Sequence, residues 1–426
     1  MKLRLSQVYI CDNSSSFNGK VCDLLIEEGV IIDIATSASS KITTPKGFKE
    51  LVLKGKTISP AFVDMRADFC DPGFEHKETL STGAVAALKG GFSDVALLPA
   101  KNPACDNKSS IQYIVNAAKN LPVKLHPYGA ATINLEGEEM AELYDMQQSG
   151  AIGFTDGNKP LGNAGLLLRI LQYNLIFKGL LLALPNEKTL SAGGNMHEGK
   201  VSTLLGLKGI PSLAEEAAII RDLEVLKYAE AKMHFSCISS KGAVELIRKA
   251  KRQGLKVTCD VAVANLCFTD ENLNTYDTNF KVVPPLRTKQ DQKALWEGLQ
   301  DGTIDAICSN HQPQAIEDKA VEFEYAAHGM ITLPWMLPLL LQAKPLNFPL
   351  DSLLAAITHH PRSILGLPKT NIEKGGPATA LVCFDTQTEF VVQNNPSKSA
   401  NFPLFDTKLK GKIWWVFNHK TLYTQE

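Results

Sequence analysis

The sequence predicts an α/β protein in which a (β/α)8 TIM barrel carries a small β-sandwich domain built from both ends of the chain. Eight short apolar runs between residues 58 and 309 alternate with amphipathic helical patterns, which is the order expected of a barrel. Strand-like segments separated by turn residues occur before and after this region. With 426 residues, the chain is long enough for one large barrel and a smaller domain.

The apolar runs are the predicted barrel strands, and a helical pattern follows most of them. Several of these helical patterns stop at a glycine. The predicted strands are Ile58–Asp68, Asp94–Pro99, Lys124–Thr132, Ala151–Thr155, Leu180–Leu184, Met233–Cys237, Lys256–Ala262 and Ile304–Ser309. The clearest predicted helices are Thr79–Lys89, Leu213–Ala231, Lys241–Gln253 and Gln290–Gln300. Eight strand–helix units in a row favour a closed barrel over a doubly wound open sheet, which is the alternative.

Both ends of the chain read as short strands. Asp23–Ile34 predicts a hairpin that turns at Glu28-Gly29, and Ala380–Phe384 and Gly411–Phe417 are strand-like. We therefore predict a domain formed by residues 1–57 and 366–426, and a barrel formed by residues 58–365. Such a domain would bring the two ends of the chain close together.

Composition and charge are those of an ordinary globular protein, with 44% hydrophobic and 21% charged residues. A net charge of −1 offers no argument for nucleic acid or for an anionic membrane, so neither is predicted as a partner. Nine dispersed cysteines without a Cys-x-x-Cys pair favour reduced thiols in a cytoplasmic protein. No secretory signal or membrane-spanning stretch is evident, because the longest apolar run, 330–341, is short and contains two prolines.

The first predicted barrel strand carries the most informative motif. Its end reads Asp64-x-Arg66-x-Asp68-x-Cys70-x-Pro72-Gly73, with polar side chains at the C-terminal end of a barrel strand, where barrel enzymes keep their chemistry. Residues 66 and 68 are two apart, so in a strand they would point the same way. The pattern resembles the Asp-x-His-x-His-x-Arg-x-Pro-Gly signature of cyclic amidohydrolases, and of dihydroorotases in particular.

Further blocks extend this resemblance over nearly the whole chain. They are DPGFEHKE (71–78), GGF (90–92), GAIGFTDG (150–157), MHEG (196–199), GIP (209–211), VVPPLR (282–287) and DGTID (301–305). The resemblance implies the amidohydrolase type of barrel. In active members of this family, two zinc ions at the mouth of the barrel activate a water molecule that attacks a cyclic amide.

The positions at which the family keeps its metal ligands differ here. The resemblance assigns them to Arg66, Asp68, Asp156, Leu184, Cys237 and Asn310, of which only Asp156 is the expected residue. Arginine stays protonated and leucine has no donor atom, so neither can bind a metal ion. Asn310 takes the place of the catalytic base, and an amide does not accept a proton near neutral pH.

The family's substrate-binding positions also differ, and they are occupied by Cys70, Ala100 and Val283. We therefore expect no catalytic residue and no bound zinc or other cofactor. A different metal site made from Asp68, Cys70, Asp156, Cys237 and His311 is the alternative, and the charge of Arg66 opposes it. Because a buried carboxylate needs a partner, we predict that Arg66 occupies part of the vacated metal space and pairs with one or both of Asp68 and Asp156.

These expectations favour a catalytically inactive dihydroorotase-like protein of pyrimidine biosynthesis. Inactive chains of this family are structural or regulatory partners of aspartate carbamoyltransferase, so the resemblance implies that partner and, in addition, a homodimer. The first alternative is an active dihydroorotase or related cyclic-amide hydrolase, which converts dihydroorotate to carbamoyl aspartate with a rebuilt or metal-free site. A second alternative is a small-molecule sensor that keeps the pocket without the chemistry.

Overall fold

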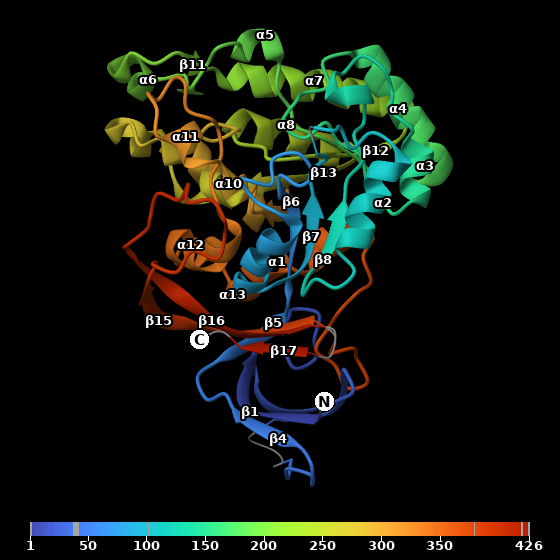
Figure 1. Ribbon diagram of the computed structural model, residues 1–426, viewed down its shortest axis with the longest axis vertical. Coiled ribbons are helices and arrows are strands. Elements are labelled where there is room, and N and C mark those ends of the chain that lie inside the picture. Colours follow the sequence, from blue (N-terminus) through green and yellow to red (C-terminus); the bar gives the residue numbers. More distant parts are fainter. Residues whose placement is uncertain (1, 37–41, 101, 379, 419–420, 425–426) are drawn as a thin grey trace.

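A barrel surrounded by helices stands on a sheet that contains strands from both ends of the chain (Figure 1). The computed structural model describes residues 2–36, 42–100, 102–378, 380–418 and 421–424. In Figure 1 the blue strands from the start of the chain and the red strands from its end lie together below the barrel. The predicted architecture, a TIM barrel with a β-domain built from both termini, is therefore confirmed.

Parallel strands form the wall of the barrel. They are β6 (Phe62–Ala67), β7 (Phe92–Leu97), β8 (Lys124–Pro127), β9 (Leu181–Ala183), β12 (Lys232–Phe235), β13 (Lys256–Ala262) and β14 (Ala306–Cys308). Isolated parallel bridges join Gly129 to Phe154 and Phe154 to Leu181, so the predicted fourth strand is present only as a bridge at Phe154. A further bridge between Ala67 and His311 connects the first and last strands and closes the ring.

Helices cover the outside of the barrel. The longer ones are α1 (Leu80–Lys89), α2 (Lys108–Ala117), α4 (Ala164–Phe177), α7 (Ser212–Ala229), α8 (Lys241–Arg252), α10 (Lys289–Gln300) and α12 (Met336–Ala343). The shorter ones are α3 (Leu143–Gln148), α5 (Lys188–Ser191), α6 (Lys200–Leu205), α9 (Val263–Cys267), α11 (Ile316–Lys319), α13 (Leu350–Ala355) and α14 (His359–Ile364), with 3-10 turns η1 (Ile133–Leu135), η2 (Asp270–Thr275), η3 (Thr278–Phe280) and η4 (Leu333–Trp335).

Helix α8 illustrates why these segments are helical. The Ser240 hydroxyl caps it by accepting a hydrogen bond from the backbone N–H of Ala243, and its buried residues recur at helical spacing along one face. The buried residues are Ala243, Val244, Ile247 and Ala250. The four helices predicted most clearly are all present, with ends that differ from the predicted ones by one or two residues.

The lower sheet joins the two ends of the chain. Its strands are β1 (Lys2–Ile10), β2 (Val21–Glu27), β3 (Val30–Thr36), β4 (Lys49–Val52), β5 (Thr57–Pro60), β15 (Ala380–Val391), β16 (Lys408–Asn418) and β17 (Thr421–Thr424). Strand β5 pairs with β1 on one side and with β15 on the other. The first predicted barrel strand is thus two strands, and residues 58–60 lie in this sheet rather than in the barrel.

The hairpin between β2 and β3 turns where the sequence predicts it. Glu28 and Gly29 connect the paired residues Glu27 and Val30, and their φ angles of 49° and 80° lie in the left-handed region. A two-residue turn with both φ angles positive matches the right-handed twist of the strands.

Two further short strands, β10 (Met196–His197) and β11 (Gly209–Ile210), pair with each other outside the barrel. None of the helices that the structure describes is long and apolar enough to cross a bilayer.

Candidate functional site

The Arg66 side chain lies buried at the C-terminal end of β6, with only 1% of its surface exposed. Its Nε donates a hydrogen bond of 3.0 Å to Asn310 Oδ1. Nη2 donates to Asn158 Oδ1 at 2.6 Å and to the Gly157 carbonyl at 3.1 Å, and Nη1 lies 3.4 Å from Ser236 Oγ. The guanidinium group therefore occupies the mouth of the barrel, as predicted, but all the oxygens it contacts are neutral.

Amide side chains extend these contacts across the mouth. Gln312 Nε2 donates to Asn310 Oδ1 at 2.8 Å, and Asn158 Nδ2 donates to Gln312 Oε1 at 3.0 Å. Asn310 Nδ2 donates in turn to the Val283 carbonyl at 2.8 Å. We refer to Arg66, Asn158, Asn310 and Gln312 as the Arg66 network. A fully hydrogen-bonded network of this kind holds its members in one arrangement.

The predicted ion pairs of Arg66 with Asp68 and Asp156 are wrong. Strand β6 ends at Ala67, so Asp68 lies in the following turn and accepts a hydrogen bond from the backbone N–H of Cys70. Asp156 Oδ1 accepts from the backbone N–H groups of Ala131 and Thr132, and its Oδ2 accepts from the Thr132 hydroxyl at 2.6 Å. Local backbone donors thus satisfy both carboxylates, although burial still raises the pKa of Asp156.

The three remaining predicted ligand positions have different surroundings. Leu184 is buried among apolar residues of the barrel interior, together with Cys237. Cys237 follows β12 with a φ of 57°, and its backbone N–H donates to Asp260 Oδ1 at 2.6 Å. Asn310 belongs to the Arg66 network and uses both ends of its amide there. The six predicted positions therefore do not converge on one common point.

The former substrate positions do not form a polar clamp. Cys70 is half-buried, with its sulfur 3.9 Å from the Pro313 carbonyl, and Ala100 is buried. The half-buried Val283 contributes only its carbonyl, which accepts from Asn310. His311 lies beside these residues and accepts a hydrogen bond on Nδ1 from the backbone N–H of Thr332 at 3.1 Å, which fixes the orientation of its ring.

A second polar group lies deeper in the barrel, between β12, β13 and β14. The sulfur atoms of Cys237 and Cys308 are 3.5 Å apart, and Cys308 Sγ is 3.3 Å from Asp260 Oδ1. Asp260 Oδ2 accepts from His234 Nε2 at 2.9 Å and lies 3.4 Å from Ser236 Oγ. We call Cys237, Asp260 and Cys308 the thiol–carboxylate cluster. All three residues are buried.

The sequence analysis missed Asp260 and Cys308 as site residues. The available signal is a charged residue with apolar neighbours inside a predicted strand, since Asp260 lies between Cys259 and Val261 in β13. The same signal marks Asp64 in β6, which accepts hydrogen bonds from the backbone N–H of Ser309 at 2.7 Å and from the Ser309 hydroxyl at 2.5 Å. A charged residue is rarely buried without partners, so such interruptions point to polar sites inside a core.

Burial and neighbouring charges act differently on the two buried aspartates. Burial raises the pKa of Asp64 to about 7, and the hydrogen bonds from Ser309 only partly offset this effect. Burial also acts on Asp260, but the hydrogen bond and charge of His234, the Cys237 N–H and the charge of Arg66 together leave the pKa of Asp260 below its usual value. Of these two aspartates, Asp260 is therefore the one whose ionised form the surroundings favour.

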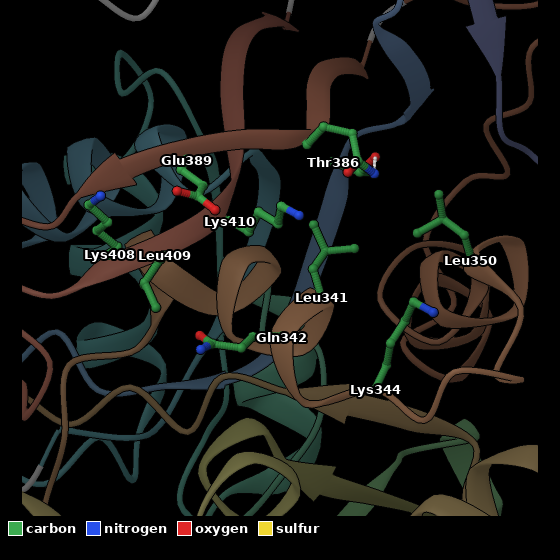
Figure 2. Close-up of a pocket in the computed structure, with 10 residues that line it drawn as sticks. Leu341, Gln342, Lys344, Leu350, Thr386, Glu389, Lys408, Leu409 and Lys410 are labelled. Carbon is green, nitrogen blue, oxygen red and sulfur yellow. Dashed lines mark hydrogen bonds between the residues drawn. The ribbon is translucent and has the colours of Figure 1, made fainter.

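Two open cavities lie away from the mouth of the barrel. One of about 410 Å³ lies between α12 and the hairpin of β15 and β16 (Figure 2), and one of about 530 Å³ lies near Trp335 and Phe390. Figure 2 shows lysines from the helix side and from the hairpin around the first of these, with Glu389 between Lys408 and Lys410. Neither cavity is lined by a residue of the Arg66 network or by a predicted ligand position.

The motif positions do not fit the two-zinc site that the resemblance implies. Arg66 and Leu184 cannot coordinate a metal ion, and the Asn310 amide is fully engaged by Arg66, Gln312 and the Val283 carbonyl. Asp156 is turned toward the backbone of 131–132. A metal ion in this chain would therefore need ligands other than this set.

Comparisons with known proteins agree on the family. A family model described as Dihydro-orotase-like matches residues 55–243. A dihydroorotase from Syntrophus aciditrophicus is 39% identical over 416 residues and covers 97% of both chains, and one from Acetivibrio thermocellus is 36% identical over 423 residues and covers 98% of both. An L-hydantoinase from Arthrobacter aurescens shares the fold, with a TM-score of 0.86 at 21% identity over 100% of this chain and 96% of its own.

These relatives overturn two predictions. The prediction of a catalytically inactive protein is wrong, because relatives 36–39% identical over nearly the whole chain carry the name dihydroorotase. The prediction that no cofactor is used is wrong as well, because dihydroorotases and hydantoinases are metal-dependent amidohydrolases. Both predictions rested on the residues at the motif positions, with a rebuilt metal site only as the alternative. By the extent and level of its identity with these relatives, the chain belongs to the dihydroorotase family of cyclic amidohydrolases.

Proposed function

We propose that the protein is a dihydroorotase-type hydrolase that opens a cyclic amide, with dihydroorotate and carbamoyl aspartate as the substrate and product pair. The observation that carries this proposal is the identity of 36–39% with dihydroorotases over nearly the full length of both chains. The relatives thus share the barrel and the β-domain together.

The electrostatics of the mouth suit such a substrate. Dihydroorotate carries a carboxylate, and hydrolysis of its amide develops further negative charge on the carbonyl oxygen. The Arg66 guanidinium brings a fixed positive charge to the mouth, and its direct partners, Asn158, Asn310, Ser236 and the Gly157 carbonyl, are all neutral. A preorganised cation in a water-poor site stabilises negative charge more strongly than it would in water.

The half-buried Asn158 covers part of this charge. Its side chain accepts from Arg66 and donates to Gln312, and it follows directly after the Asp156-Gly157 turn. Movement of this side chain would free one Nη2 donor of Arg66, while the other would stay with the Gly157 carbonyl. Asn310 cannot act as a general base, so the group that takes the proton from water must lie elsewhere.

The proposal is tested by following ring opening of dihydroorotate with the full-length purified protein, with hydantoin and dihydrouracil as comparison substrates. We expect turnover of dihydroorotate well above the uncatalysed rate and preferred over both neutral rings, because only dihydroorotate carries a carboxylate for Arg66. Absence of turnover in a folded protein that was expressed with added zinc would contradict the proposal.

We further propose a homodimer that associates with aspartate carbamoyltransferase and works in the cytosol. The family resemblance supports the dimer and the partner, and the nine cysteines, which are all free thiols in the structure, support the cytosol. Size-exclusion chromatography with light scattering measures the oligomeric state. Co-purification with the aspartate carbamoyltransferase of the same organism tests the partner, and a lack of association at concentrations where both chains are soluble would contradict it.

A further inference from the structure

We propose that Cys237, Asp260 and Cys308 form a zinc site inside the barrel, in which Cys308 lies one residue layer below the motif position of Asn310. Among the residues that the structure describes, this is the group of at least three cysteine, histidine or acidic side chains whose ligand atoms converge, all within 4.8 Å of one another. Only Cys237 belongs to the motif positions.

Two of the three separations between the ligand atoms are close to those of tetrahedral zinc, and all three atoms lie within 4.8 Å of one another. Two thiolates bound at 2.3 Å lie about 3.8 Å apart, and a thiolate and a carboxylate oxygen lie about 3.5 Å apart, in ideal tetrahedral geometry. The corresponding separations here are 3.5 Å between the two sulfurs and 3.3 Å between Cys308 Sγ and Asp260 Oδ1. Small outward shifts of the side chains would therefore accommodate the ion without a change in the strands.

The carboxylate is already oriented for this role. Asp260 Oδ2 accepts from His234 Nε2 at 2.9 Å, and His234 Nδ1 is itself 2.8 Å from Thr258 Oγ1. The other oxygen, Oδ1, thereby faces the two sulfurs. Partners of this kind behind a ligand fix its orientation in metal sites. The hydroxyl of Ser236, 4.0 Å from Cys237 Sγ and 3.4 Å from Asp260 Oδ2, or a water molecule, would complete the four ligands.

Charge balance explains how Arg66 and a metal ion can coexist. With zinc bound, the two thiolates and Asp260 carry three negative charges, and zinc together with Arg66 carries three positive charges when the His234 ring is neutral. Arg66 directs its hydrogen bonds to the mouth of the barrel, and it reaches this cluster only through Ser236 at 3.4 Å. In a buried site, such neutrality offsets much of the cost of removing the ions from water.

The test is the metal content of the full-length protein, purified without chelators from cells supplied with zinc. We expect about one tightly held zinc ion per chain, coordinated by two sulfurs in X-ray absorption, and its loss in Cys308→Ser and Cys237→Ser. Cys259→Ser is the matched control, because Cys259 is equally buried but its sulfur contacts the Thr303 carbonyl, and this variant should keep the metal.

Protein grown with cobalt in place of zinc provides a second measurement, which depends neither on activity nor on the stability of a variant. It should show a thiolate-to-cobalt charge-transfer band in the near ultraviolet. Metal-free wild-type protein, a disulfide between Cys237 and Cys308, or metal bound without sulfur ligands would each overturn the proposal. None of these results decides whether dihydroorotate is turned over. The proposed zinc site and the proposed activity can therefore be refuted independently of each other.

Discussion

Two polar groups share the barrel of this protein, and they differ in chemistry. The Arg66 network at the mouth contains one fixed cation and neutral amides, joined by hydrogen bonds of 2.6 to 3.3 Å. The thiol–carboxylate cluster contains two thiols and a carboxylate backed by a histidine. The first group occupies the place where the family motif keeps its metal ligands, and the second holds residues that can bind a metal.

The difference shows that ligand chemistry can lie next to a motif rather than in it. Strand spacing places residues two apart in successive layers of a barrel, so a site can move inward by a single layer. Asp64 and Cys308 lie two residues before Arg66 and Asn310 respectively. The motif positions alone present an arginine and an amide. The Asp64 carboxylate and the Cys308 thiol in the layer beneath them lie outside the motif ligand positions.

The largest effect should come from removing the carboxylate of the deeper group. Asp260→Ala leaves His234 Nε2 and the Cys237 N–H without their buried acceptor. We expect the free energy of unfolding to fall by about 3–5 kcal/mol, the range for breaking a buried charged pair. Urea unfolding at neutral pH measures the change. A loss below about 1 kcal/mol would show that the deeper group is not held together by this residue.

A smaller change in unfolding free energy should come from the titration of Asp64. This side chain accepts hydrogen bonds from Ser309, whose hydroxyl also lies 3.2 Å from the Arg66 carbonyl. The folded-state pKa of about 7 lies above the ordinary value of 3.8, so as the pH rises the unfolded chain loses this proton first. Stability contributed by protonated Asp64 is therefore present below about pH 4 and is lost progressively up to about pH 7, by at most about 4 kcal/mol.

Asp64→Asn, which does not titrate, isolates this contribution. The unfolding free energy of the wild type minus that of the variant should decrease between about pH 4 and about pH 7 and level off above. A difference that stays constant over this range would mean that the folded state does not retain the proton.

The smallest of the three effects should come from the mouth. Arg66→Lys keeps the charge but loses the planar fork that contacts Asn310, Asn158 and the Gly157 carbonyl together. We expect a loss of about 2 kcal/mol in unfolding free energy, and a rise in KM for dihydroorotate that exceeds the change in kcat. An unchanged KM would remove Arg66 from substrate binding and leave it a structural role only.

The fold could be predicted because its signals are local and repeated. Apolar runs, glycine stops and the turn at Glu28-Gly29 each specify a short segment, and their order along the chain allows few arrangements other than a barrel with a second domain. The prediction was less accurate where tertiary pairing decides. Residues 57–60 run almost directly into β6 along the chain, yet they pair with β1 and β15 because those strands provide the open edges.

The site was predicted less well, for a related reason. From the sequence alone, Arg66 could be placed at the mouth of the barrel, and arginine, leucine and asparagine could be recognised as unsuitable metal ligands. The partners of Arg66 depend on loops that follow different strands, and only the tertiary structure brings Asn158, Asn310 and Gln312 to it in place of Asp68 and Asp156. The convergence of Cys237, Asp260 and Cys308 likewise arises from three strands that are neighbours only after the barrel has closed, because the distances between side chains on different strands are set by packing and not by sequence spacing.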